Sequence, residues 1–401
     1  NSMGGIVNAS NTTFRNNIRS VEFMSYKNIN TNNEEIDNVS KFTNCTFEWN
    51  ENIYSNDKLR LDHVTLWDVK GVKFIACDFK NTLTNNNEVS KQGIYSEEAG
   101  FTVQGKIIPI PTGIEIDRSE FINLTYGIRA ENISHSKNFN VQTSYFEDNF
   151  SGIFSVASNN ITIKNNLFRI KPIHKPQGDF PDYAAFGVAV HGCSRYQIQE
   201  NDFIGLNSDH PYKIGVQVKS SGEGANRISD NNFINLFQAS QAIGNNRGIS
   251  NMPSTGLKYM CNNFIESNYA IVVTPNNLIK NGIAINQDGG DISLSAENVF
   301  SQNTSILGSD IFNDNTSVIN YYSTQIGDKK PLAITSLVYN YLANSTNGVC
   351  LKNYDLWDNV TLSNAFVALE NDYISLLYSY NNLLDGGSKD ALLDKIQGTW
   401  T

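Results

Sequence analysis

Residues 152–168 read GIFSVASNNITIKNNLF, and this stretch decides the fold. Apolar residues alternate with polar ones, an Asn-Asn pair interrupts them, and a second alternating run closes on Phe168. Alternation with a period of two, together with many β-branched side chains, predicts β-strands and excludes an amphipathic helix. Each predicted strand is too short to be stable alone, so it must pair with strands from other parts of the chain.

The same pattern recurs along the chain, and each copy closes on a phenylalanine. The shortest steps are those from Phe121 to Phe146 and from Phe146 to Phe168, which are 25 and 22 residues long. A small residue followed by alternating apolar residues precedes most copies, as in YGIRA (126–130). A unit of this length with two or three short strands predicts one coil of a parallel β-solenoid, in which each strand pairs with its equivalent one coil away. The closing residues are Phe14, Phe47, Phe79, Phe121, Phe146, Phe168, Phe203, Phe233, Phe264 and Phe300.

The asparagines before each closing phenylalanine have two expected roles. Asparagine tolerates the left-handed backbone conformation that a sharp corner needs. Stacked at one register, asparagine amides can also form hydrogen bonds from coil to coil. Cys45 and Cys77 both stand two residues before their closing phenylalanine, so we expect them to be neighbouring buried free thiols. Cys261 stands one place earlier in its coil and is not expected to join them.

This repeat resembles the right-handed parallel β-helix proteins of the pectate-lyase-like superfamily. More narrowly, it resembles repeat-containing surface proteins that Bacteroidetes secrete through the type IX system. The resemblance rests on the glycine-led strands and the N-x-F motifs of about residues 4–325. It implies right-handed coiling and a location outside the cell, at the cell surface, but no particular activity.

The fold class expected is therefore all-β, a right-handed parallel β-helix of about ten coils over residues 1–328, with a C-terminal helical segment over 329–401. In that segment LAITSLVYNYLANS (332–345) and the residues after 361 place apolar side chains at helical spacing. Helices there would cap the open end of the solenoid. The two chain ends look like the middle of a longer or processed protein, so we expect the segment to continue.

Composition excludes several classes of function. The net charge is −10 and the pI about 5.1, which disfavours nucleic acid as a partner because phosphates need a basic surface. No apolar run approaches the roughly 20 residues that span a bilayer. The five cysteines are too sparse for a disulfide framework and contain no C-x-x-C, and no carboxylate loop of the calcium-binding kind is present, so neither cofactor nor metal is expected.

Two long loops carry the best candidate site. Residues 171–185 and 205–214 precede the equivalent strands GVAV and GVQV, so the loops should emerge side by side. Histidine beside carboxylates could act in acid–base chemistry or bind a sugar, although loops are usually just polar and solvated. The recognisable catalytic sets of β-helix hydrolases, lyases and epimerases are missing. The candidate ligand-binding residues are His174, Lys175, Asp179, Asp182, Tyr183, Asp209, His210, Tyr212 and Lys213.

Two functions remain open from the sequence. The first is a non-enzymatic structural or adhesive module of a large secreted surface protein, with surface glycans or other cell-surface and secretion-system proteins as partners. The second is a carbohydrate-binding or polysaccharide-degrading β-helix, either a lyase or a hydrolase. Exposed aromatic side chains along one face would favour the second, and a smooth polar surface would favour the first.

Overall fold

The computed structural model divides the chain into two compact units, Asn1–Lys106 with Ile116–Cys350, and Ile107–Glu115 with Leu351–Thr401. The second unit is described only for the strands β13 (Lys106–Ile110) and β14 (Gly113–Asp117), which pair with each other. The structure describes residues 6–29, 32–51, 62–83, 92–110, 113–134, 137–174, 183–206, 211–247, 253–276, 281–290, 292–301, 308–314, 316–324, 327–343 and 350.

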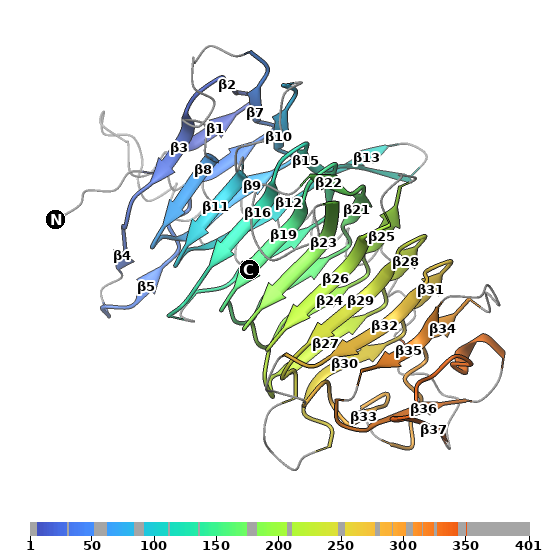
Figure 1. Ribbon diagram of the computed structural model, residues 1–401. Helices are drawn as coiled ribbons and strands as arrows, with labels where there is room; N and C mark the ends of the chain where they lie inside the picture. Colours follow the sequence, from blue (N-terminus) through green and yellow to red (C-terminus); the bar gives the residue numbers. More distant parts are fainter. Residues whose placement is uncertain are drawn as a thin grey trace, which may run out of the picture. The chain divides into compact units, whose positions relative to one another are not determined.

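The first unit contains three long parallel sheets, which the chain visits in a fixed order (Figure 1). We call them sheets A, B and C and give their strands below. The chain passes from sheet C to sheet A, then to sheet B, and returns to sheet C one strand further on. Each strand pairs in parallel with the equivalent strand of the preceding and following passage, for example Phe146 of one passage with Phe168 of the next. This arrangement confirms the predicted all-β fold with long parallel sheets and is consistent with a β-helix solenoid.

Sheet A has nine strands with polar outer positions. In spatial order they are β1 (Asn8–Ser10), β6 (Lys41–Thr43), β9 (Lys70–Ile75), β12 (Gly100–Gln104), β17 (Phe139–Gln142), β20 (Thr162–Lys164), β24 (Gln197–Gln199), β27 (Ala225–Ser229) and β30 (Gly256–Met260).

Sheet B has ten strands and carries the closing phenylalanines. In spatial order they are β2 (Thr13–Arg15), β7 (Thr46–Trp49), β10 (Asp78–Asn81), β15 (Ser119–Ile122), β18 (Ser144–Glu147), β21 (Leu167–Ile170), β25 (Asp202–Gly205), β28 (Asn232–Ile234), β31 (Asn263–Ile265) and β34 (Val299–Phe300).

Sheet C has eleven strands, of which β22 (Ile173–His174) pairs only with β23. The others are, in spatial order, β3 (Arg19–Phe23), β8 (Asp62–Trp67), β11 (Gln92–Glu97), β16 (Tyr126–Glu131), β19 (Ser151–Val156), β23 (Tyr183–His191), β26 (Lys213–Lys219), β29 (Gln238–Ile243), β32 (Tyr269–Thr274) and β35 (Ser309–Asn313).

The closing phenylalanines point inward and stack, as predicted. Successive ring centroids from Phe14 to Phe300 lie 4.6 to 5.5 Å apart with nearly parallel planes. The glycines that open the sheet C strands make room for these rings. A Cβ on Gly152 would lie 2.9 Å from the Phe168 ring, and one on Gly187 would lie 2.6 Å from the Phe203 ring. The stack therefore explains why glycine and phenylalanine recur together.

The asparagines form a continuous ladder inside the corner between sheets A and B, again as predicted. We call Asn166, Asn201, Asn231, Asn262 and Asn298 the Asn ladder. Each Oδ1 accepts from the backbone N–H and the Nδ2 of the preceding member, at 2.9 to 3.2 Å. From Asn166 to Asn298 each Nδ2 also donates to a backbone carbonyl of the preceding coil. The ladder thereby joins successive coils through buried amides.

The residue that takes the left-handed backbone conformation at this corner is not the Asn ladder residue itself. It lies immediately before the ladder residue, and only some members are asparagine, such as Asn165 with φ 55°. Glutamate, aspartate and cysteine take the same conformation at Glu200, Asp230 and Cys261. The two roles assigned to asparagine from the sequence are thus divided between neighbouring residues.

Nearer the N-terminus, Cys45 and Cys77 occupy the ladder position, followed by Ser119 and Ser144. Both thiols are buried and free, as predicted. Cys261 instead forms a disulfide with Cys350, with Cα atoms 5.5 Å apart, a pairing that the sequence did not predict.

The remaining described elements are short. Strands β4 (Asn28–Ile29) and β5 (Glu35–Ile36) form a hairpin after β3, and η2 (Gly327–Lys329) is a single 3-10 turn. Strands β33 (Asn286–Gln287), β36 (Ile319–Ser323) and β37 (Val338–Leu342) form a parallel sheet.

The helix expected over residues 332–345 is wrong for the part of this range that the structure describes. Residues 338–342 are strand β37, which pairs with β36 from Ile319 to Ser323. The sequence VYNYL alternates as well as it fits helical spacing, and an available strand edge decides in favour of the strand. Parallel pairing thus continues past residue 328, while the expected helices after 350 lie outside the described residues.

Candidate functional site

The strands that follow the two candidate loops are neighbours, as the sequence implied. In the register of β23 and β26, Phe186 pairs with Ile214 and Val188 with Val216. His174 of β22 lies directly opposite Tyr183 of β23 in an antiparallel pair. Lys175, Asp179, Asp182, Asp209 and His210 lie outside the described residues, so the site that they would form stays a prediction.

Two further candidates occupy ordinary positions. Tyr212 is exposed, and its ring packs edge-on against Phe237 at 5.4 Å. The Lys213 ammonium donates to the carbonyl oxygen of Leu206 at 3.2 Å, and desolvation lowers its pKa.

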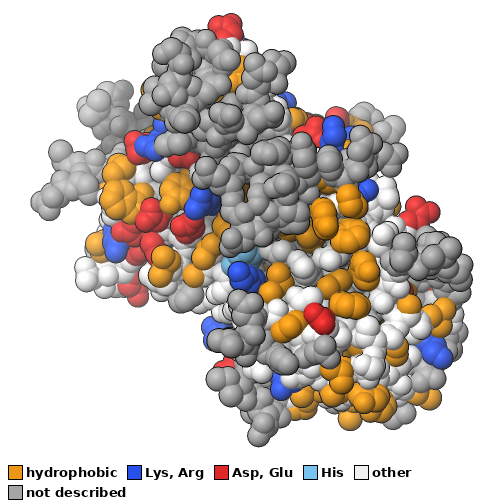
Figure 2. All heavy atoms as spheres, viewed as in Figure 1, with side chains coloured by type: hydrophobic (Ala, Val, Ile, Leu, Met, Phe, Trp, Pro, Cys, Tyr) orange, Lys and Arg blue, Asp and Glu red, His pale blue; other side chains and the backbone are white. Residues whose placement is uncertain are grey.

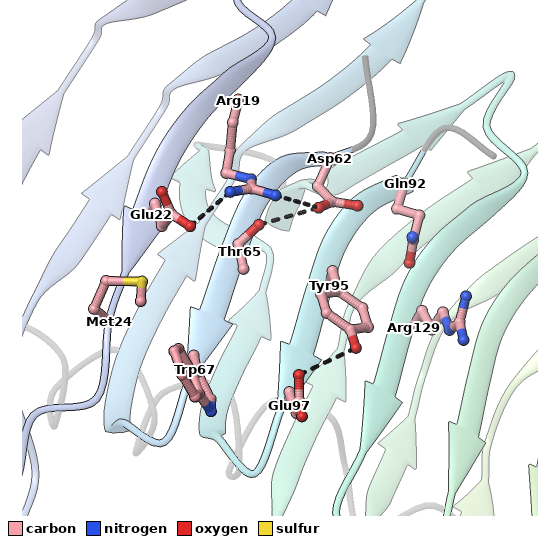
Figure 3. A pocket seen from close by; sticks show the side chains of 10 residues that line it. All are labelled: Arg19, Glu22, Met24, Asp62, Thr65, Trp67, Gln92, Tyr95, Glu97 and Arg129. Carbon is pink, nitrogen blue, oxygen red and sulfur yellow. Dashed lines mark hydrogen bonds and ion pairs between the residues drawn. The ribbon is translucent and has the colours of Figure 1, made fainter. Parts of the chain in front are cut away.

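A pocket that the sequence did not indicate lies on the outer face of sheet C near its N-terminal end (Figure 3). Its volume is about 360 Å³. In Figure 2, acidic, basic and hydrophobic side chains gather over this part of the sheet. We call it the sheet C pocket; it is lined by Arg19, Glu22, Met24, Asp62, Thr65, Trp67, Gln92, Tyr95, Glu97 and Arg129.

Strand alternation places these side chains. In β8, Val64 and Leu66 point into the core, and Thr65 and Trp67, which alternate with them, face outward. Parallel pairing then aligns Thr65 with Tyr95 of β11 on the neighbouring coil. The lining therefore comes from β3, β8, β11 and β16, whose outward residues are brought together only by the coiling of the chain.

The two ends of the pocket differ in chemistry. At one end, Arg19, Asp62 and Gln92 begin their strands in a single row. At the other end lie Met24 and Trp67, whose side chains are 51% and 44% exposed. Five residues separate Asp62 from Trp67 along β8, which corresponds to about 16 Å at roughly 3.3 Å per residue. We call these the polar end and the apolar end.

Ion pairs organise the polar end. The Arg19 guanidinium lies 2.6 Å from a Glu22 carboxylate oxygen and 3.7 Å from Asp62 Oδ2. Thr65 Oγ1 donates to the same Asp62 oxygen at 3.1 Å. Because Asp62 is almost fully buried, desolvation raises the pKa of its carboxyl group to about 6.

Three buried polar atoms at this end have no hydrogen-bond partner within the described part of the chain. They are Arg19 Nε, Asp62 Oδ1 and Gln92 Oε1. Asp62 is 3% exposed and Gln92 is 7% exposed, so solvent does not satisfy them freely. Buried polar groups are nearly always satisfied in native proteins, and unsatisfied ones cost roughly 1–3 kcal/mol each. A ligand with hydroxyl groups would supply the missing partners once these side chains turn toward it, because the three atoms are buried in the structure as it stands.

Aromatic rings and an arginine form the wall toward β16. The Arg129 guanidinium carbon lies 5.6 Å from the ring centroids of both Tyr95 and Tyr126, and the group pairs with Glu131 at 2.5 Å. Phe154 continues the row of aromatic side chains, with its ring 5.4 Å from Tyr126. Desolvation, together with Glu131 and Glu97, raises the pKa of Tyr95 to about 12, so its hydroxyl stays protonated.

The arrangement is suited to binding polar, ring-shaped molecules. Among the described residues no group of His, Cys, Asp and Glu is placed to hold a metal ion. No helix in the described part of the chain is long and apolar enough to cross a membrane. The chain matches no protein-family model, and no curated protein matches it significantly.

Proposed function

We propose that this chain is a non-enzymatic adhesive module of a large secreted cell-surface protein and that it binds surface glycans through the sheet C pocket. The fold proposed is a right-handed parallel β-helix of the pectate-lyase-like kind, located outside the cell. The supporting observation is the combination of exposed Trp67 with three buried, unsatisfied polar atoms in one pocket. Sugars present hydroxyl groups around an apolar ring face, which matches both ends of the pocket.

The row of aromatic side chains supports glycan binding over a purely structural role. Trp67, Tyr95, Tyr126 and Phe154 all face outward from sheet C, and Trp67 is 44% exposed. The exposed fraction of Trp67 is not unusual by itself, and its place beside the pocket and in line with the other aromatic side chains supports a role in binding.

The test is direct binding to immobilised oligosaccharides, with Trp67→Ala as the variant. Tyr339→Ala is the matched control, because Tyr339 is 48% exposed but lies on β37, outside the pocket. We expect Trp67→Ala to weaken binding at least tenfold and Tyr339→Ala to leave it unchanged. Equal effects of the two substitutions, or no binding to any oligosaccharide, would contradict the proposal.

Polysaccharide cleavage is the second candidate. It is favoured by the Asp62 carboxyl group, whose pKa of about 6 suits a general acid, and by Glu22 and Glu97 in the same pocket. Incubation with acidic and neutral polysaccharides, assayed for reducing ends and unsaturated uronates, separates the two functions. Cleavage that disappears in Asp62→Asn or in His210→Ala would replace adhesion with catalysis.

A further inference from the structure

The unsatisfied atoms of the sheet C pocket specify what a ligand must offer there. Asp62 Oδ1 and Gln92 Oε1 are both acceptors, and Arg19 Nε is a donor. A complete match therefore requires a ligand that donates two hydrogen bonds and accepts one within the same small region. Sugar hydroxyl groups do both, whereas an ionised carboxylate only accepts.

Uronates also carry ring hydroxyls, so the charges of the lining are what separates neutral from acidic sugars. Three carboxylates, those of Glu22, Asp62 and Glu97, face two arginines. Arg19 already pairs with Glu22 and Asp62. Arg129 already pairs with Glu131, whose carboxylate is a fourth acidic group at this wall. Neither arginine is left to neutralise an incoming anion, and a buried, uncompensated carboxylate is costly.

We propose that the sheet C pocket selects uncharged hexose oligosaccharides and rejects their uronate counterparts. This inference rests on the proposed glycan-binding function and names the substrate class of that same site. On binding, the side chains at the polar end turn toward the ligand, whose hydroxyls donate to Asp62 Oδ1 and Gln92 Oε1 and accept from Arg19 Nε. A sugar ring packs on Trp67 at the apolar end. Because about 16 Å separates the ends, one monosaccharide cannot contact both, and the ligand is an oligosaccharide.

Matched oligosaccharide pairs test the selection, because members of each pair differ only in oxidation at C6. Calorimetry of the full chain at pH 8, where Asp62 is ionised, would compare hexamers of mannose with mannuronate, galactose with galacturonate and glucose with glucuronate. We expect at least one neutral hexamer to bind ten times more tightly than its uronate partner and than its monosaccharide.

Variants locate the selection in the pocket. Asp62→Asn replaces a carboxylate by an amide of the same shape and should reduce the neutral-to-uronate preference at least threefold. Gln92→Leu should weaken the neutral hexamer at least fivefold. Gln238→Leu is its control, because Gln238 occupies the same row of sheet C on β29, outside the pocket, and also carries an unsatisfied Oε1. Thermal melting of each variant would show that it remains folded.

The outcomes distinguish a failure of the selectivity inference from a failure of the proposed glycan-binding function. A uronate hexamer that binds as tightly as its neutral partner would overturn the selectivity and leave glycan binding standing. If Asp62→Asn leaves the preference for neutral over uronate hexamers unchanged, the sheet C pocket is not the source of that preference. Failure of every hexamer to bind at millimolar concentration would overturn both the inference and the proposed function.

Discussion

The corner between sheets A and B is built in two different ways along the same row. From Asn166 onward it is the Asn ladder, in which every amide bonds to the neighbouring coil. Before Asn166 the same position holds Cys45, Cys77, Ser119 and Ser144. The two thiols contact carbonyl oxygens at 3.4 to 3.5 Å, and Ser119 Oγ accepts from the backbone N–H of Cys77 at 3.0 Å. Apolar stacking is therefore common to both halves, whereas a continuous chain of amide bonds between coils belongs to the second half.

The comparison teaches that the most regular bonding between coils and the candidate site occupy different parts of the three parallel sheets. The half without the Asn ladder carries the sheet C pocket, with its buried charges and unsatisfied atoms. The half with the ladder shows the most complete coil-to-coil bonding. Functional sites commonly hold such energetically unfavourable groups, and the surrounding structure must stabilise them.

The largest effect should come from breaking the ladder at its centre. Asn231→Leu removes four hydrogen bonds and leaves the backbone N–H of Asn201 without its partner. We expect a loss of about 4–6 kcal/mol in the free energy of unfolding. Cys77→Ser is the control at the same position of the first half and should cost about 1 kcal/mol. Urea unfolding measures both, and similar losses would refute the contrast.

The second prediction concerns the feature that the two halves share. Phe146→Ala, before the ladder, and Phe233→Ala, within it, each remove a ring stacked on both sides. Both should cost about 3–5 kcal/mol, because each leaves a cavity of the same size in the same kind of core. A difference of more than about 2 kcal/mol would show that the ladder also governs how well the core relaxes.

The smallest effect is a dependence on pH contributed by two adjacent buried residues of the first half, Asp62 and His63. Burial lowers the pKa of His63 to about 3, from 6.5, so its contribution to stability is lost as the pH falls below about 6.5. Burial raises the pKa of Asp62 to about 6, from 3.8, so its contribution increases as the pH falls from about 6 to about 4. These two contributions should nearly cancel each other between pH 6 and 4.

The Asp62→Asn substitution removes the carboxyl contribution of this pair and leaves that of His63. The free energy of unfolding of this variant should then fall by about 1.4 kcal/mol per pH unit, or roughly 3 kcal/mol from pH 6 to 4. Adding His63→Gln should make the profile level again. Urea unfolding at pH 6, 5 and 4 checks both, and a level profile for the single variant would disprove the assignment.

The sequence was most informative where one register repeats. The stacked phenylalanines, the asparagine amides and the neighbouring thiols of Cys45 and Cys77 were predictable because each follows from a fixed place in the coil. The strand at 338–342 was not predictable, since VYNYL fits both periods and only its pairing with β36 decides.

The sheet C pocket escaped prediction for a physical reason. Arg19, Asp62, Gln92 and Arg129 come from four coils separated by insertions of different length, and each resembles an ordinary outward polar residue of its strand. The burial of Asp62 and Gln92 and the ion pairs of the two arginines appear only with the register of β3, β8, β11 and β16. The candidate loop residues had a stronger signal in the sequence, but most of them lie outside the described residues.

The disulfide between Cys261 and Cys350 has a mechanical consequence. The two cysteines are 89 positions apart, and the chain between them includes β31 to β37. Tension applied to the chain beyond Cys350 passes through the covalent bond to Cys261 and bypasses every strand in between. Those strands are shielded from peeling one by one, and the load is delivered to the corner residue that immediately precedes Asn262 of the ladder. In the adhesive role proposed above, the pulling force would enter the parallel sheets at their hydrogen-bonded half.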